Sequence, residues 1–294
     1  MLDLEQYLQD SKAAIDQALM ESLPLAVNSK VAAAMRYSVE AGGKRLRPLL
    51  CLATAQVLGA EQEAVIDVAC ALEMVHTYSL IHDDLPAMDD SDLRRGKASC
   101  HAVFGEAMAI LAGDALLTLA FGKIAVYGQE EQQATKAVWI AYELAAAAGV
   151  KGMIGGQELD LLAEGKSLTL TEVEEIAALK TGALFSAAVR CGALAAGAGQ
   201  FELEVLSSFA RLTGKAFQIV DDLLDGKATA ADLGKPVEAD FKKVKATLPA
   251  LLGAEAAQAR ADQLYQQATK ELQKLGADAG LLQMLGHRLI YRDK

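Results

Sequence analysis

Apolar residues recur at helical spacing along almost the whole chain, as in the stretches 52–84 and 107–124. A spacing of three and four residues places apolar side chains on one face of an α-helix. Glycine and proline interrupt this pattern and leave segments of roughly 12 to 25 residues, each long enough for a helix. The interruptions fall at Gly42–Gly43, Leu85–Pro86, Gly128, 149–156, Gly165, 197–199, Gly226, 234–236 and Gly253. Thr169 and Thr171, just before Glu172, predict a capped helix start. The pattern predicts an all-α fold, a single-domain bundle of about ten helices over residues 1–294.

Composition supports this prediction and excludes several classes of protein. Of the 294 residues, 56 are alanine, the best helix former, and only 15 are aromatic. The net charge of −11 argues against a surface for nucleic acid or anionic membranes, which needs basic residues. The acidic opening stretch does not resemble a signal peptide, and no uncharged apolar run reaches the ~18 residues of a membrane span. Four cysteines without CxxC or zinc spacing are expected to be buried, reduced thiols. We therefore expect a soluble, cytoplasmic protein without stable membrane insertion.

The first of two acidic clusters, HDDLPAMDDSD, covers residues 82–92. It follows the apolar run MVHTYSLI, and Pro86 is expected to end the helix just before it. Neighbouring carboxylates repel one another, and the negative C-terminal end of a helix is an unfavourable place for them. A solvated turn would tolerate such a run. Because this run adjoins a strongly apolar segment, we expect it to face a cavity.

The second acidic cluster, FQIVDDLLD, covers residues 217–225. Its polar residues stand at i, i+3, i+4 and i+7 on one stripe of a helix, and they are Gln218, Asp221, Asp222 and Asp225. Burying such carboxylates is costly unless a cation is present. Acidic helix faces are usually just solvated, but two clusters, each at the end of an apolar helix, are better explained by shared divalent ions. Oxygen ligands of this kind favour Mg²⁺ or Mn²⁺ over Zn²⁺.

Basic residues accompany the two acidic clusters. Mg²⁺ held by a few carboxylates completes its coordination with water and substrate phosphates, and those phosphates need further cations. The motif GGKRLRP (42–48) carries three positive charges, and RRGK (94–97) directly follows the first acidic cluster. Lys180, Lys235 and Lys245 complete the set. Each basic group alone would be an ordinary surface charge, but together with the acidic clusters they favour a diphosphate site.

With these motifs in this order, the chain resembles the short-chain trans-isoprenyl diphosphate synthases, and among them the bacterial farnesyl diphosphate synthases. The matching segments span essentially the whole chain and are GGKRLRP (42–48), LIHDDLPAMDDSDLRRG (80–96), GGQELDLLAEGK (155–166), KTGALF (180–185), FQIVDDLLD (217–225) and LGK (233–235). The resemblance implies helices around a deep central cavity, usually in a homodimer. It also implies a prenyltransferase that condenses isopentenyl diphosphate head-to-tail with dimethylallyl or geranyl diphosphate, giving farnesyl diphosphate (C15) and diphosphate.

The resemblance assigns roles to individual residues. The implied ligands of three Mg²⁺ ions, for which Mn²⁺ could substitute, are Asp83, Asp89 and Asp221. Outer support for these ions would come from Asp84, Asp222 and Asp225. The residues implied to bind the allylic diphosphate are Arg94, Lys180 and Lys235. Those implied to bind isopentenyl diphosphate are Gly43, Lys44, Arg47, His76 and Arg95. The residues implied to act at the reacting carbons are Lys180, Thr181 and Gln218.

The resemblance also bears on product length. Tyr78 and Ser79 lie five and four residues before Asp83, and Pro86–Ala87 lie within a two-residue insertion of this subfamily. In the family, an aromatic residue at this position, together with the insertion, usually limits the product to about C15. Tyr78 could instead be an ordinary core residue, so geranylgeranyl diphosphate (C20) is the alternative product.

Some residues depart from the family, and other functions remain open. A stretch that often reads VxGD is 226–229 here, and Glu238 and Val244, in the loop before Lys245, replace common glycines. A class I terpene cyclase usually centres its second metal motif on asparagine, whereas the chain's one asparagine is Asn28. A non-catalytic metal-binding helical protein would leave the basic motifs unexplained. An acidic interaction scaffold would need exposed apolar helix stripes, which a homodimer also needs.

Overall fold

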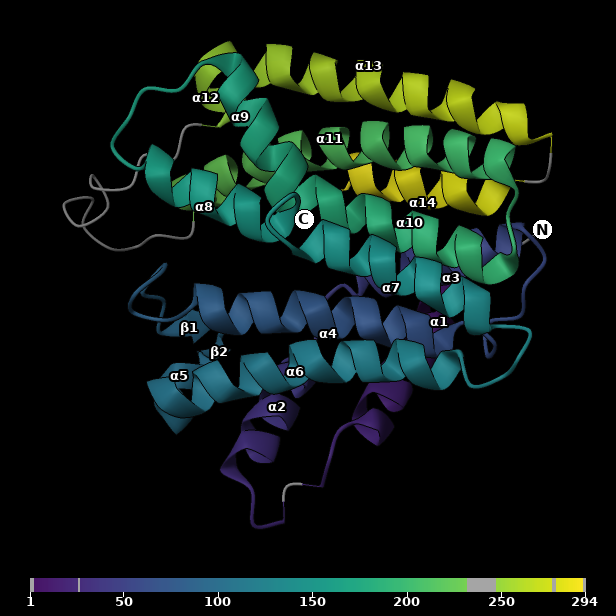
Figure 1. Cartoon of the computed structure of the whole chain (residues 1–294). Coiled ribbons are helices and arrows are strands. Elements are labelled where there is room, and N and C mark those ends of the chain that lie inside the picture. Colours follow the sequence, from purple (N-terminus) through teal and green to yellow (C-terminus); the bar gives the residue numbers. More distant parts are fainter. Residues whose placement is uncertain (1–2, 26, 232–246, 277–278, 293–294) are drawn as a thin grey trace. The chain divides into compact units, whose positions relative to one another are not determined.

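The computed structural model describes residues 3–25, 27–231, 247–276 and 279–292, which form α-helices and one short hairpin (Figure 1). The helices are α1 (Leu4–Ser22), α2 (Lys30–Glu40), α3 (Leu46–Val57), α4 (Ile66–Asp83), α5 (Cys100–Phe104), α6 (Glu106–Tyr127), α7 (Ala134–Ala148), α8 (Met153–Ala163), α9 (Leu170–Ala177), α10 (Ala183–Ala196), α11 (Gln200–Ala231), α12 (Leu248–Leu252), α13 (Ala254–Leu272) and α14 (Gly280–Ile290). The hairpin consists of β1 (Leu93–Arg94) and β2 (Lys97–Ala98). The all-α prediction is confirmed. The described residues hold fourteen α-helices rather than about ten, partly because α5 and α12 are pieces of only five residues.

The chain folds as two compact units. The first comprises Met1–Tyr142 and Cys191–Ala198, and the second comprises Glu143–Arg190 and Gly199–Lys294. The chain passes from one unit to the other within α7, within α10 and again just before α11. The prediction of a single domain stays a prediction.

In the first unit, α4 and α6 lie side by side along much of their length (Figure 1). Most buried residues of α6 are spaced by three or four positions, and four of the seven are small: Ala109, Ala112, Gly113, Leu116, Ala120, Ile124 and Tyr127. Small side chains let two helix backbones approach closely. The facing helix α4 is buried almost throughout, from Val68 to Ile81. This pair therefore fixes the helix that carries the first acidic cluster.

In the second unit, α11 packs along α13 (Figure 1). The Tyr265 hydroxyl of α13 donates a hydrogen bond to the Gln283 carbonyl of α14 at 2.7 Å. Gly286 of α14 lies against the same tyrosine, because a Cβ there would come within 2.9 Å of the ring. These contacts hold α13 and α14 together in the unit that carries the second acidic cluster.

Most predicted helix ends are confirmed. The helix before Pro86 ends at Asp83, and Thr169 forms a capping box with Glu172. The end predicted at Gly226 is wrong, because α11 continues to Ala231. A single glycine inside a helix costs only about 1 kcal/mol relative to alanine, and helix-forming residues follow it. The second acidic cluster is therefore inside a helix and not at its end.

Three stretches are long and apolar enough to cross a membrane, by length and composition alone: Glu106–Tyr127, Ala134–Ala163 and Leu170–Ala196. Their apolar windows are 33% to 44% buried within the fold. The first of them includes the charged residues Asp114 and Lys123, so it is not one of the uncharged apolar runs considered in the sequence. The absence of stable membrane insertion stays a prediction.

Candidate active site

A tight turn after the C-terminal end of α4 brings the backbone of Asp89 back to that of Asp83. After Pro86 the chain turns back, so that the Asp89 N–H donates to the Asp83 carbonyl at 2.8 Å and the Ser91 N–H donates to the Asp84 carbonyl at 3.1 Å. Both Asp83 and Asp89 are half-buried. The turn therefore brings together two predicted metal ligands that are six residues apart in the sequence.

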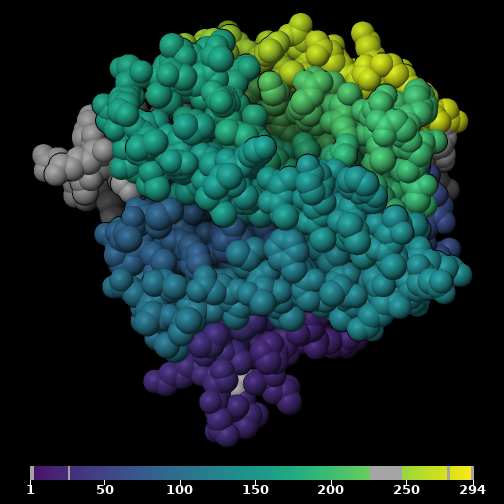
Figure 2. Space-filling model, in the orientation of Figure 1, coloured from purple at the N-terminus to yellow at the C-terminus, as the bar shows by residue number. Residues whose placement is uncertain are grey.

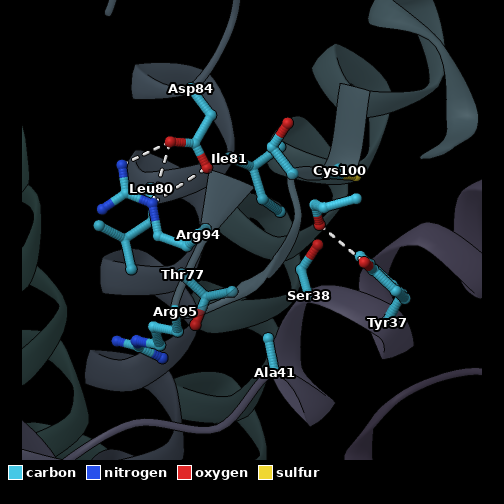
Figure 3. Close-up of a pocket in the computed structure, with 12 residues that line it drawn as sticks. Tyr37, Ser38, Ala41, Thr77, Leu80, Ile81, Asp84, Arg94, Arg95 and Cys100 are labelled. Atoms are coloured by element: carbon cyan, nitrogen blue, oxygen red, sulfur yellow. Dashed lines mark hydrogen bonds and ion pairs between the residues drawn. The ribbon is translucent and has the colours of Figure 1, made fainter. Parts of the chain in front are cut away.

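The hairpin after this turn carries Arg94 and Arg95. Its two-residue turn is formed by Arg95 and Gly96, both with positive φ (53° and 76°), as hairpins of this length require. Arg94 donates from Nε to both carboxylate oxygens of buried Asp84, at 2.9 and 3.1 Å, and from Nη2 at 2.5 Å (Figure 3). These hydrogen bonds raise the pKa of Arg94. The side chains of Asp84, Arg94 and Arg95 line a small pocket together with residues of α2, such as Tyr37 (Figure 3).

Arg95 lies against the loop that precedes α3. A Cβ at Gly43 would come within 2.5 Å of the Arg95 Nη1 atom, and Gly43 has a φ of 145°. Glycine suits this position both because of the backbone conformation and because of the close approach. The structure thus brings Gly43 and Arg95 into contact, whereas the neighbouring Lys44 is exposed.

His76 of α4 lies close to Arg47 of α3 and to Arg95. Burial, followed by the positive charges of these two arginines, lowers the pKa of His76 well below its usual value. The imidazole is therefore neutral at pH 7 and keeps one N–H to donate. Three elements of the first unit thus bring together three of the residues predicted to bind isopentenyl diphosphate.

We expect His76 to make the chain less stable as the pH falls. The unfolded chain binds a proton at this residue near pH 6.5, but the folded chain binds it only at a much lower pH. The free energy of unfolding should therefore fall by up to about 1.4 kcal/mol per pH unit below pH 6.5. Urea unfolding of the natural chain and of His76→Gln between pH 8 and 5 measures this slope. Replacement of the exposed His287 by glutamine is the control, and equal slopes for the natural chain and His76→Gln would contradict the assignment.

Arg45 lies within the GGKRLRP motif (42–48), but its side chain points inward and the residue is only 4% exposed. It donates from Nε to Asp16 Oδ1 at 2.7 Å, from Nη1 to Glu73 Oε1 at 2.9 Å and from Nη2 to the Val39 carbonyl at 2.7 Å. Burial lowers the pKa of Arg45, but Glu73 and Asp16 outweigh burial, so the pKa lies above its usual value. The prediction that Arg45 is one of the cations available to a phosphate is therefore wrong. Its role is to tie the motif to α1, α2 and α4.

In the second unit, Lys180 and Thr181 lie in a π-helical turn (Ala178–Gly182) between α9 and α10. Such turns occur frequently at functional sites. Gly156 of α8 packs directly against the turn, since a Cβ there would come within 2.2 Å of the Lys180 backbone nitrogen. The Lys180 ammonium donates to Asp160 Oδ2 at 2.6 Å. Gly156 and Asp160 of α8 therefore position the backbone and the side chain of Lys180, respectively. This role of α8 was not predicted from the sequence.

The second acidic cluster lies along α11. Gln218 donates from Nε2 to Asp222 Oδ1 at 2.8 Å, as their spacing of four residues allows. Burial raises the pKa of Asp222 to about 6; the hydrogen bond from Gln218 opposes this rise, and the charges of Asp221 and Asp225 add to it. Crowded carboxylates of this kind favour the binding of a cation.

Asp221 already has one cationic partner in the structure. Arg292, just after α14, forms an ion pair with it, and its guanidinium lies 4.4 Å from the centroid of the Phe217 ring. The Arg292 side chain is only 7% exposed. The two residues are 71 positions apart, so no local pattern predicts that they pair.

The predicted product-length residues lie in the second half of α4, before the acidic residues at its C-terminal end. Tyr78 is buried, and its ring meets the His82 ring edge-on with centroids 5.7 Å apart. The Ser79 hydroxyl donates to the His76 carbonyl at 2.9 Å. The Ser79 hydroxyl is thus satisfied within α4 and does not point into solvent.

Some predicted residues lie outside the described part of the chain: Lys235, Glu238, Val244 and Lys245. Among the described residues, no three or more histidine, cysteine or acidic side chains are placed to hold a metal ion by themselves. In the first unit, the predicted metal ligands Asp83 and Asp89 therefore form a pair and not a larger group. The four cysteines are buried and free, as predicted.

The whole chain is similar to several prenyl diphosphate synthases. It is 45% identical to farnesyl diphosphate synthase of Geobacillus stearothermophilus over 99% of both chains, and 46% identical to that of Escherichia coli over 100% of both. A geranylgeranyl diphosphate synthase of Cyanophora paradoxa is 44% identical over 90% of this chain and 89% of its own. Among solved structures, an FPP/GFPP synthase from Zymomonas mobilis matches with a TM-score of 0.84 and 38% identity, over 98% of this chain and 97% of that one.

The profile of one protein family covers most of both units. It is described as "Polyprenyl synthetase" and matches residues 28–279. The resemblance stated from the motifs is therefore confirmed, as is the isoprenoid-synthase type of fold. The chain belongs to the polyprenyl synthetase family.

Proposed function

We propose that this chain is a prenyltransferase that condenses isopentenyl diphosphate with dimethylallyl or geranyl diphosphate and releases farnesyl diphosphate and diphosphate. The observation that carries this proposal is the arrangement in the first unit, where the carboxylate pair of Asp83 and Asp89 and the cations around His76 are carried by the same helix and its neighbours. The relatives named farnesyl diphosphate synthase match the chain over its full length, which supports the same reaction.

The carboxylates fit a magnesium site that is completed by substrate. Mg²⁺ in proteins is usually held by one or two carboxylates, together with water and substrate phosphates. Asp83 and Asp89 offer such a pair, and Asp221 would hold a further ion. We infer three ions when diphosphate is bound, and Mn²⁺, which accepts the same ligands, is expected to substitute. When bound, magnesium neutralises charge on the departing diphosphate.

The cations would bind the two substrates. Arg94, Lys180 and Lys235 would bind the allylic diphosphate. The second diphosphate would be bound by Lys44, Arg47, His76 and Arg95, with the backbone at Gly43. Neutral His76 would donate its N–H to a phosphate oxygen, beside arginines that supply the charge. Thr181 and Gln218 would line the path of the reacting carbons.

The proposed reaction needs no protein nucleophile. The bond between C1 and the bridging oxygen of the allylic diphosphate breaks, and its electron pair leaves with diphosphate. The double bond of isopentenyl diphosphate attacks the allylic cation and forms the new carbon–carbon bond. A proton then passes to the departing diphosphate and a double bond is restored. The chain's part is to orient the substrates and to stabilise the charge that develops on the leaving group.

Product identity tests this proposal directly. The purified chain is incubated with Mg²⁺, isopentenyl diphosphate and either allylic diphosphate, and the dephosphorylated products are sized by chromatography. A dominant C15 alcohol that disappears with EDTA is expected. A C20 alcohol would replace the product assignment with the alternative that the Cyanophora relative suggests. A cyclised hydrocarbon, or metal binding without any product, would overturn the proposal.

Tyr78→Ala is expected to lengthen the product. If the Tyr78 ring limits chain growth, its removal leaves room for another C5 unit, and most of the product should shift from C15 to C20 or longer. The measurement is the ratio of C20 to C15 alcohols under the same conditions. An unchanged ratio would show that Tyr78 is an ordinary core residue.

The chain is proposed to act as a homodimer in the cytoplasm. In the first unit, α6 lies at the surface, as Figure 2 shows, and it exposes Ile110 and Leu111. In α7, the next helix along the chain, Trp139 and Tyr142 are 55% and 63% exposed. Large exposed apolar side chains of this kind favour an interface between chains. Light scattering should give about twice the 31.0 kDa of one chain.

A further inference from the structure

His82 connects the side chain of Tyr78 to the backbone of α6. It lies one helical turn after Tyr78 on α4, and the two rings meet edge-on with an interplanar angle of 74°. Its Nε2 atom lies 3.0 Å from the Ile110 carbonyl of α6. Because a carbonyl oxygen only accepts, Nε2 is the donor in this hydrogen bond. The imidazole therefore fills the space between the Tyr78 ring and the neighbouring helix.

Gly113 of α6 makes room for this imidazole. A Cβ at Gly113 would lie 2.1 Å from His82 Nε2 and 2.6 Å from Cδ2, distances at which one of the two groups must move. A buried glycine inside a helix costs about 1 kcal/mol relative to alanine. The close approach of His82 explains why glycine, despite this cost, occupies position 113.

We propose that His82, seated on Gly113, is a positioning residue that sets product length by holding the Tyr78 ring in place. This inference rests on the proposed function and on the assignment of Tyr78 as the residue that limits chain growth. The Tyr78 hydroxyl is buried and has no hydrogen-bond partner in the part of the chain that the structure describes. Packing therefore holds the ring, and the edge-on contact with His82 is part of that packing. Without the imidazole, the ring gains room to turn toward α6 and away from a growing chain.

The experiment compares product distributions of single variants under identical conditions. His82→Ala should raise the C20 to C15 ratio about tenfold, the usual scale for a change in a hydrophobic pocket. His82→Gln should restore most of the natural ratio, since the amide nitrogen can donate to the Ile110 carbonyl. Gly113→Ala should also raise the ratio, because it displaces the imidazole, and it should add no further change when combined with His82→Ala.

The same helix offers a matched control. Gly122 also lies in α6, but a Cβ there would have no atom within 4 Å. Gly122→Ala should therefore keep the natural product ratio while testing the same chemical change. Circular dichroism confirms that each variant is folded. If Gly113→Ala does not fold, the His82→Ala and His82→Gln pair decides.

The outcomes separate this inference from the proposed function. If Tyr78→Ala lengthens the product and His82→Ala leaves it at C15, the positioning role of His82 is overturned and the proposed function stands. If neither variant changes a C15 product, the roles of both residues in product length are overturned. A natural chain that forms no prenyl product would overturn the proposed function and this inference together.

Discussion

Asp89→Asn is expected to lower kcat for farnesyl diphosphate formation by about 10³-fold, equivalent to about 4 kcal/mol of lost transition-state stabilisation. Asp89 is held beside Asp83 by a backbone hydrogen bond, so the substitution leaves the turn in place and removes only one charge from the pair. A neutral amide is a poorer ligand for a hard divalent ion than a carboxylate. The charge that develops on the departing diphosphate would then lose part of its stabilisation.

Asp90 is the matched control for this experiment. It follows Asp89 directly, its side chain is exposed, and its φ of 51° is one that asparagine adopts readily. Asp90→Asn should keep kcat within about twofold of the natural chain, because exposed substitutions away from a site have small effects. Binding of Mn²⁺, followed by electron paramagnetic resonance, should weaken in the Asp89 variant alone. Equal activity of the two variants would remove Asp89 from the metal site.

Arg45→Met is expected to lower the free energy of unfolding by about 3–5 kcal/mol, because it leaves the buried Glu73 carboxylate without its cation. Asp16 is 41% exposed at its side chain and can be hydrated, so most of the loss should come from Glu73. Urea unfolding measures the change. A second variant that combines Arg45→Met with Glu73→Leu should recover most of the loss, since a buried ion pair is often replaceable by apolar side chains. If Arg45→Met were as stable as the natural chain, the buried contacts of Arg45 would have no net effect on stability.

The helical architecture could be predicted from the sequence because its signals are local. Apolar spacing, Pro86 and the Thr169 capping box act within a few residues of the helix ends that they specify. The helix end predicted at Gly226 is wrong because a lone glycine weakens a helix without ending it when helix-forming residues follow. The short hairpin was not predicted either, since Arg95 takes a positive φ that an arginine rarely adopts.

The residues of the candidate site could be named from motifs, but their contacts could not. Arg45 shares a motif with Lys44, yet the first is buried between acidic residues of α1 and α4 and the second is exposed. Those partners lie 29 and 28 positions away, and nothing in the local pattern indicates them. The same holds for Asp160, which binds Lys180 from a different helix. Contacts between distant segments depend on packing, which a single sequence does not display.

Two cations that are proposed to bind a diphosphate, one in each unit, already have carboxylate partners: Arg94 with Asp84 and Lys180 with Asp160. A diphosphate that binds to either cation replaces the carboxylate partner of that cation, so its binding releases few bound salt ions into solution. The affinity for diphosphates should therefore change little with ionic strength, in contrast to a basic surface that binds phosphates by releasing condensed ions. In this way a chain of net charge −11 can select phosphate esters without attracting polyanions such as nucleic acids.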